Sequence, residues 1–215
     1  MGFNPDELPV VTLFRGKTFN GLTRLILESE TIPSDWFRAK ELRERIGTSS
    51  TAFGNVRDQA VAYGLIEPST DDESARMPRY RIPESPTVQL LRSFHEEYDP
   101  TEDDDVSDDV DAVILPDLME LNGRARLIGW FLAAADPDQQ YSISKMADVA
   151  PVGHTTVRNH IDTLVEYGIV TPHDTSRGEQ TYTTYQFNPE STVAAVLYDL
   201  NETIANQRAA YYENE

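Results

Sequence analysis

Residues 155–170, TTVRNHIDTLVEYGIV, have a close counterpart in residues 51–66, TAFGNVRDQAVAYGLI. When the two stretches are aligned, a threonine, an asparagine, an aspartate, a valine, a tyrosine and a glycine fall at identical positions. A proline follows each stretch at the same distance, at Pro68 and Pro172. Self-similarity of this kind indicates a duplicated structural unit. The sequence therefore predicts two units with the same order of elements.

The later stretch, residues 155–170, has the apolar spacing of an amphipathic helix. Its apolar residues recur at i, i+4, i+7 and i+8, so they share one helical face. These residues are Val157, Ile161, Leu164 and Val165. We expect the helix to end before Gly168, because glycine readily adopts the left-handed conformation that closes a helix.

The earlier stretch, residues 51–66, departs from this apolar pattern. Arg57 stands where the later stretch has Ile161, and Ala60 stands where it has Leu164. We therefore expect the helix in the first unit to be rotated so that Val56 packs against the core instead.

Further helices are predicted before each of these stretches. The segment NGLTRLI at 20–26 recurs as NGRARLI at 122–128, and Asn20 and Asn122 are expected to cap the first helix of each unit. A short second helix is expected at two places, residues 39–46 and 143–150.

Each unit is expected to end in a β-hairpin, because apolar and β-branched segments follow the third helix. The predicted strand pairs are residues 65–67 with 79–82, and residues 169–171 with 183–187. The polar tips between them are residues 69–77 and 173–180.

Three helices followed by a hairpin, with a Tyr-Gly break after the third helix, resemble the winged helix-turn-helix family. The second unit resembles transcriptional regulators of archaea, haloarchaea included, and of bacteria. The resemblance implies a mainly α fold with small β-hairpins, built as two winged helix-turn-helix domains in tandem plus a C-terminal helix. The expected boundaries are a first domain at 1–98, an acidic linker at 99–111, a second domain at 112–189 and a C-terminal helix at 190–215.

This resemblance implies a set of DNA contacts, because the third helix of the family lies in the major groove. Arg158 has the geometry to bind guanine with two hydrogen bonds, and Asn159 has the geometry to bind adenine. Wing arginines would contact phosphates. The predicted DNA-binding residues are Thr155, Thr156, Arg158, Asn159, Thr163 and Arg177 in the second unit, and Ser50, Thr51, Asn55, Arg57, Arg76, Arg79 and Arg81 in the first.

The C-terminal helix has an apolar stripe. Its members are Val193, Val196, Leu197, Leu200, Ile204 and Tyr211. A helix of this kind appended to a winged module often pairs with a second copy, so the stripe predicts a homodimer. The alternative is that the helix folds back on the core of its own chain.

The charge of the chain is strongly negative, with 37 acidic and 18 basic residues and a net charge of −19. Only Lys17, Lys40 and Lys145 are lysines, and the other basic residues are arginines. This composition resembles that of proteins from halophiles that accumulate potassium salt. The alternative is an acidic protein of an ordinary cytoplasm that avoids nucleic acid.

Other classes of protein are disfavoured. There is no cysteine, so a disulfide or a thiolate zinc site is excluded. The four histidines are scattered and no catalytic motif stands out, so we expect no metal, no cofactor and no enzymatic activity. No apolar run approaches the roughly 20 residues of a membrane span, so we expect a cytoplasmic protein that does not bind a membrane.

The sequence thus predicts a sequence-specific regulator that binds double-stranded DNA at high salt. The alternative is a non-catalytic adaptor that binds proteins, similar in architecture to acidic tandem winged-helix subunits of chromosome-segregation complexes.

Overall fold

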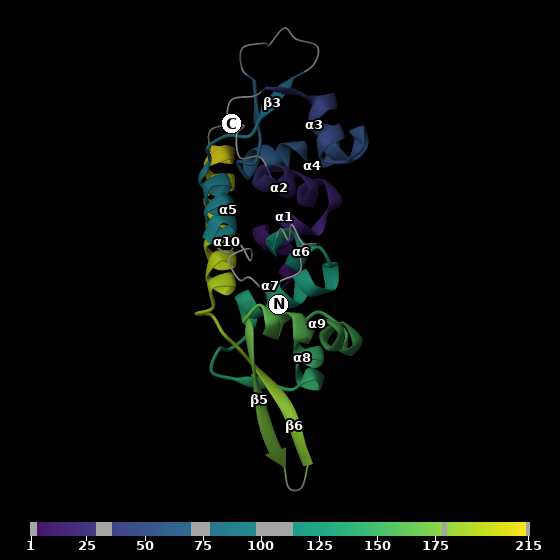
Figure 1. Ribbon diagram of the computed structural model, residues 1–215, viewed down its shortest axis with the longest axis vertical. Helices are drawn as coiled ribbons and strands as arrows, with labels where there is room; N and C mark the ends of the chain where they lie inside the picture. Colours follow the sequence, from purple (N-terminus) through teal and green to yellow (C-terminus); the bar gives the residue numbers. More distant parts are fainter. Residues whose placement is uncertain (1–3, 29–35, 70–77, 98–113, 178–179, 214–215) are drawn as a thin grey trace, which may run out of the picture. The chain divides into compact units, whose positions relative to one another are not determined.

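The computed structural model describes residues 4–28, 36–69, 78–97, 114–177 and 180–213 (Figure 1). Within these residues the chain is mainly helical, with two small antiparallel sheets of three strands each. The chain divides into two compact units. Unit 1 comprises residues 1–12 and 121–201, and unit 2 comprises residues 13–120 and 202–215.

Unit 1 has three complete α-helices, a long hairpin and parts of two further helices. Its elements are η1 (Pro5–Glu7), the first part of α1 (Pro9–Arg15), α7 (Asn122–Ala134), β4 (Gln140–Tyr141), α8 (Ile143–Val149), α9 (His154–Glu166), β5 (Val170–Arg177), β6 (Gln180–Phe187) and the first part of α10 (Thr192–Glu213). α9 packs against α7, α8 and β5, and the sheet order is β4-β6-β5.

Aromatic side chains fill the core of unit 1. Trp130 meets Tyr141 edge-on at 5.2 Å between ring centroids, and Phe131 stacks on Phe187 at 5.7 Å. Aromatic pairs in these geometries add about 0.5–1.5 kcal/mol beyond the burial of their area. The short strand β4 is therefore held to the helices by its tyrosine as well as by its pairing with β6.

Unit 2 has the same order of three helices and a sheet, followed by further helices. Its elements are the second part of α1, α2 (Lys17–Glu28), β1 (Phe37–Arg38), α3 (Ala39–Arg45), α4 (Ser50–Ala62), β2 (Glu67–Pro68), β3 (Arg79–Arg81), α5 (Pro86–Glu97), α6 (Ile114–Met119) and the second part of α10. α2 packs against α4, α5 and α6, and the sheet order is β1-β3-β2.

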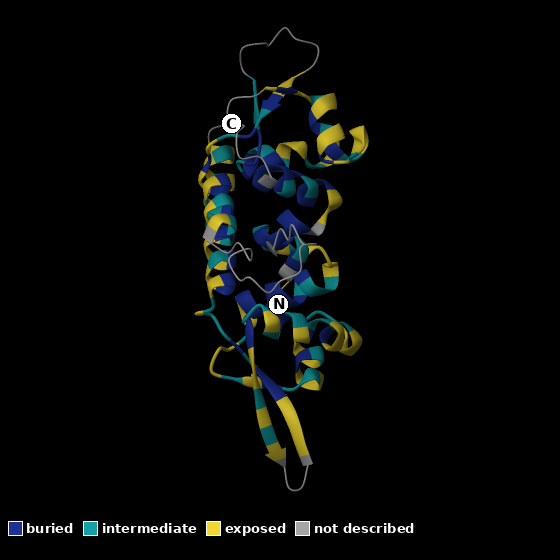
Figure 2. Ribbon diagram, viewed as in Figure 1, coloured by how far each residue is buried: buried dark blue, intermediate teal, exposed yellow. Residues whose placement is uncertain are grey.

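The core of unit 2 joins its sheet to α4 and α4 to α2. Phe53 of α4 meets Tyr80 of β3 edge-on at 5.6 Å, and Phe19 of α2 stacks on Tyr63 at 5.9 Å. All four rings are at most 4% exposed. Buried residues, dark blue in Figure 2, lie along the helices of this unit.

Two helices contribute residues to both units. In α1, Val10 belongs to unit 1 and Leu13 to unit 2, and both side chains are fully buried. In α10, Leu200 belongs to unit 1 and Ile204 to unit 2, and both are fully buried as well. The compact units therefore group the termini differently from the boundaries drawn on the sequence repeat, and the predicted linker at 99–111 lies outside the described residues.

Most of the predicted helices are present. α3, α4, α8 and α9 cover the predicted second and third helices, and α10 covers the predicted C-terminal helix. Gly64 and Gly168, which follow the third helices, have φ of 70° and 66°, as the Tyr-Gly break predicts. Among the described residues, no helix has the length and apolar composition needed to cross a bilayer.

The predicted helix caps at Asn20 and Asn122 are wrong. α2 begins at Lys17, and the backbone N–H of Asn20 already donates to the carbonyl of Gly16 at 2.9 Å. Asn122 is the first residue of α7, and the capping position before it is Leu121. α2 begins directly after the break at Gly16, so the repeated asparagine lies inside the helix and not before it.

The observed sheets differ from the predicted hairpins in the length of their strands, and each sheet has one strand that was not predicted. β1 and β4 add a third strand to each sheet, and β5 continues through residues that the sequence assigned to a polar tip. The hydroxyl groups of Thr175 and Thr184 are hydrogen-bonded across this hairpin at 2.9 Å. In unit 2, Leu65 and Ile66 are buried but precede β2, which begins at Glu67.

The glycine in each repeated Asn-Gly pair permits close packing. A Cβ atom at Gly21 would lie 2.5 Å from the carbonyl oxygen of Ile46, at the end of α3. A Cβ atom at Gly123 would lie 2.6 Å from Cγ2 of Thr156 in α9. The repeat therefore preserves a close approach to the first helix, although the neighbour differs between the units.

We expect Gly21→Ala to destabilise the protein by about 1–3 kcal/mol, because the new methyl group meets a backbone oxygen that cannot move independently. Gly54→Ala is the matched control, since Gly54 lies in α4 with nothing within 4 Å of a Cβ atom. The control should stabilise the protein by about 0.5–1 kcal/mol through helix propensity. Urea unfolding in KCl measures both, and equal stabilisation by the two substitutions would contradict the close packing.

Candidate nucleic-acid interface

α9 presents a polar face to solvent because its apolar stripe is buried in unit 1. Val157, Ile161 and Leu164 are at most 1% exposed. On the other side of the helix, Arg158 and Asn159 are exposed at neighbouring positions. Among the described side chains, none forms an ion pair with Arg158, so its five N–H donors face solvent.

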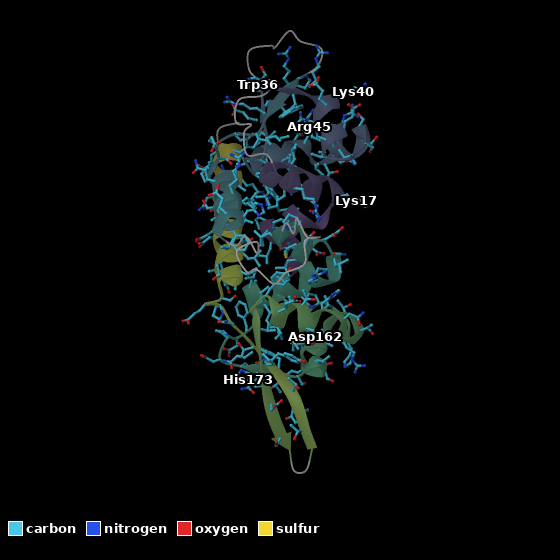
Figure 3. The ribbon with its side chains drawn as sticks, in the orientation of Figure 1. Lys17, Trp36, Lys40, Arg45, Asp162 and His173 are labelled. Carbon is cyan, nitrogen blue, oxygen red and sulfur yellow. The ribbon has the colours of Figure 1, made fainter. Side chains whose placement is uncertain are left out.

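The other predicted contacts on α9 divide between the exposed face and the packed side. Thr155 is exposed, whereas Thr156 and Thr163 are half-buried and Thr156 packs over α7. Asp162, labelled in Figure 3, is exposed one turn after Arg158. The exposed face therefore combines a positive first half with a negative second half.

His160 fills the space between α9 and α7. It is half-buried, and its Nε2 atom lies 3.5 Å from the position of a Cβ atom at Gly123. Burial, with the positive charge of Arg124 as a second cause, lowers the pKa of His160 below its usual value. The neutral imidazole is therefore favoured in the folded state.

In unit 2, α4 is oriented as α9 is in unit 1. Phe53 and Ala60 are 4% and 0% exposed, and they align with Val157 and Leu164. The predicted rotation that would bury Val56 instead is wrong, since Val56 is only half-buried. A phenylalanine in place of valine supplies apolar volume at the start of the stripe.

The exposed side of α4 carries Ser50, Thr51 and Asn55, all predicted to contact DNA. Ser49 caps this helix, because its side-chain oxygen accepts the backbone N–H of Ala52 at 3.1 Å. The three polar side chains therefore lie near the N-terminus of a helix whose first residue is fixed by this cap.

The guanidinium of Arg57 is engaged within unit 2. Its Nε and terminal nitrogen both lie 2.7 Å from Oδ1 of Asp58. The hydrogen bond to Asp58 raises the pKa of Arg57. Arg57 is therefore a weaker candidate for DNA contact than Arg158.

The predicted wing arginines differ in their surroundings. Arg79 is exposed, whereas Arg81 makes a two-pronged ion pair with Glu67, with nitrogen–oxygen distances of 3.0–3.1 Å. Arg76 lies outside the described residues. Arg177 is the last residue of β5.

A group of basic residues around α3 is not among the residues predicted from the sequence. Residues 38–45 contain four of them, Arg38, Lys40, Arg43 and Arg45, and all but Arg43 are exposed. Trp36, Lys40 and Arg45 lie at one end of unit 2 in Figure 3. Four basic residues in eight, in a chain this acidic, is a signal that the sequence did contain.

The stripe of the C-terminal helix is covered within the chain. Val193, Leu197, Leu200 and Ile204 are at most 1% exposed, and Val196 and Tyr211 are half-buried. This burial fits the alternative in which the helix folds back on the core. Pairing with a second copy through these side chains would require them to leave their present packing, so the homodimer stays a prediction.

Unit 1 also has an open cavity of about 400 Å³ beside its sheet. Asp138, His173, Phe187 and Glu190 are among its lining residues. Nε2 of His173, which Figure 3 labels, is buried and has no hydrogen-bond partner among the described residues. The described residues contain no group of three or more acidic or histidine side chains placed to hold a metal ion.

No family model, no curated protein and no solved structure matches the chain.

We expect the free energy of unfolding to fall as the pH drops below about 6.5, the usual pKa of histidine, because the folded state resists protonation of His160. His160→Gln should remove this part of the pH dependence. His154→Gln is the control, since His154 is exposed at the start of α9. Urea unfolding at several pH values tests this, and an unchanged pH profile in His160→Gln would contradict it.

Ile204→Ala is expected to lower the free energy of unfolding by about 2–5 kcal/mol, because the isoleucine is fully buried. Arg208→Ala, exposed on the same helix, should have little effect. Light scattering reports the oligomeric state of both variants. A wild-type dimer that Ile204→Ala separates into monomers of unchanged stability would support dimerisation through the stripe instead.

Proposed function

We propose that the chain is a tandem winged-helix protein that binds double-stranded DNA at specific sequences and regulates transcription at high salt. Both units have a helix, a short strand, two more helices and two further strands in the same order. In both, the short strand pairs with the last strand of the sheet. This shared order supports the winged-helix assignment.

The observation that carries the proposal is the exposed pair Arg158 and Asn159 on α9. These are the side chains that bind guanine and adenine through two hydrogen bonds each in the major groove. They stand on the first half of a helix whose opposite face is buried, so their direction is fixed by the core. A helix held in this way can present both side chains to adjacent bases.

The net charge of −19 opposes DNA binding in dilute buffer, because DNA is itself a polyanion. In 1 M salt the screening length is about 3 Å, so distant acidic residues no longer repel DNA and local contacts decide the affinity. The near absence of lysine supports an origin in concentrated salt. High-salt function and an acidic surface are therefore compatible.

The second candidate is a protein-binding adaptor. The observation that favours it is the acidic second half of the exposed face of α9, where Asp162 and Glu166 point to solvent. These carboxylates would repel phosphates and would suit a basic partner protein. The engagement of Arg57 with Asp58 in unit 2 favours the same alternative.

We expect Arg158→Ala and Asn159→Ala each to weaken binding to the preferred DNA site by about 1–3 kcal/mol and to relax selectivity at one base pair. Fluorescence anisotropy with labelled genomic fragments in molar KCl measures this, after selection of a preferred site from a fragment pool. Arg208→Ala is the control for loss of a positive charge away from α9.

α9 would not recognise the DNA sequence if the affinity for DNA were equal for all sequences and unchanged in both α9 variants. The absence of DNA binding between dilute buffer and molar KCl would refute the proposed function as a whole.

A further inference from the structure

We propose that the outward face of the β1–β3 strand pair is a phosphate-binding site, in which Arg38 and Arg79 together hold a phosphate group of the DNA backbone. This inference rests on the DNA-binding function proposed above and adds a contact that the sequence analysis did not contain. Arg79 was expected to contact phosphates from a wing together with Arg76 and Arg81, and Arg38 was not expected to take part.

The strand register brings the two arginines together. Phe37 pairs with Tyr80 and Arg38 pairs with Arg79 in the antiparallel β1–β3 ladder. Phe37 and Tyr80 are 5% and 2% exposed, so they face the core. Because side chains alternate along a strand, Arg38 and Arg79 share the outward face, and both are exposed.

Two arginines at directly opposite positions repel each other. Cβ atoms in such cross-strand pairs are about 4.5–5.5 Å apart, and like charges at these positions destabilise the sheet. Among the described side chains, no carboxylate forms an ion pair with the guanidinium of Arg38 or Arg79; the carboxylate of Glu41 instead accepts the backbone N–H of Arg38 at 2.8 Å. An anion bound between the two guanidinium groups would supply a countercharge to them.

The neighbouring arginine on the same face shows the contrast. Arg81 is two residues from Arg79, and its guanidinium is bound to both carboxylate oxygens of Glu67. The same guanidinium lies over the ring of Trp36, 5.0 Å from the centroid. Arg81 thus ties together the segment before β1, β3 and β2, and acts as a positioning residue rather than a phosphate ligand.

The chemistry of the pair fits a phosphate group. A guanidinium is planar and donates parallel hydrogen bonds that match two oxygens of one phosphate. Two guanidinium groups side by side can bind the two non-bridging oxygens of a phosphodiester. Lys40 and Arg45 of α3, which packs against β1 and β3, lie at the same end of unit 2 (Figure 3). Lys40 is paired with Glu44 at 3.7 Å, so the added positive potential comes from Arg45.

The test uses the full-length chain with Arg38→Gln, Arg79→Gln and the double variant. Arg208→Gln is the matched control, since it removes one exposed positive charge from α10. Inorganic pyrophosphate and KCl of equal ionic strength are compared for their effect on the Tm of each protein. Duplex DNA binding is then followed by fluorescence anisotropy over a range of KCl concentrations.

We expect neither single substitution to lower the Tm of the free protein, because each relieves repulsion. Pyrophosphate should raise the Tm of the wild type and of Arg208→Gln but not that of the double variant. Each substitution at the pair should weaken binding to every DNA sequence by about tenfold. It should also reduce the slope of log K against log salt by about 1.

The outcomes separate this inference from the proposed function. If the wild type binds DNA and the double variant binds it with equal affinity and salt slope, the phosphate site is overturned and the proposed function stands. If no DNA binds but pyrophosphate stabilises only proteins with the intact pair, the proposed function fails and the site belongs to a soluble phosphate compound. A pyrophosphate effect that persists in the double variant, or is lost in Arg208→Gln, overturns the site.

Discussion

Burial of Val157, Ile161 and Leu164 fixes the rotation of α9 about its axis, and the arrangement of the candidate interface depends on it. Each of these side chains contributes about 1.5–3 kcal/mol by leaving water, so a rotated helix would lose several kcal/mol. The price of such a rotation would include burying Arg158, a charge without a partner. The core of unit 1 thus determines which side chains remain available to a ligand.

Much of the fold could be predicted because the helices have strong periodicity and clear ends. The third helices, their closing glycines and the C-terminal helix all carry signals within a few residues. β1 and β4 could not be predicted, because two-residue strands have no period. The position of β4 depends on Tyr141, which packs on Trp130, and that of β1 depends on Phe37, which is buried and pairs with Tyr80 of β3. The polar part of β5 was missed because pairing with β6, not burial, extends it.

The candidate site could be predicted only where exposure follows from helical spacing. That reasoning placed Arg158 and Asn159 on the surface, as the structure does. It could not show that Arg81 is bound to Glu67, because their contact depends on the register between β2 and β3. It could not place Arg38 opposite Arg79 for the same reason, since β1 is separated from β3 by two helices.

The contribution of α1 and α10 to both units limits how the protein can be divided. A fragment that ends at residue 98 would lack Ile204 of α10, which belongs to the core of unit 2. A fragment that begins at residue 112 would lack Val10 of α1, which belongs to the core of unit 1. Gene fragments cut at the sequence repeat would therefore encode domains with open apolar cores. Each repeat in the sequence therefore lacks a buried residue that belongs to its own compact unit.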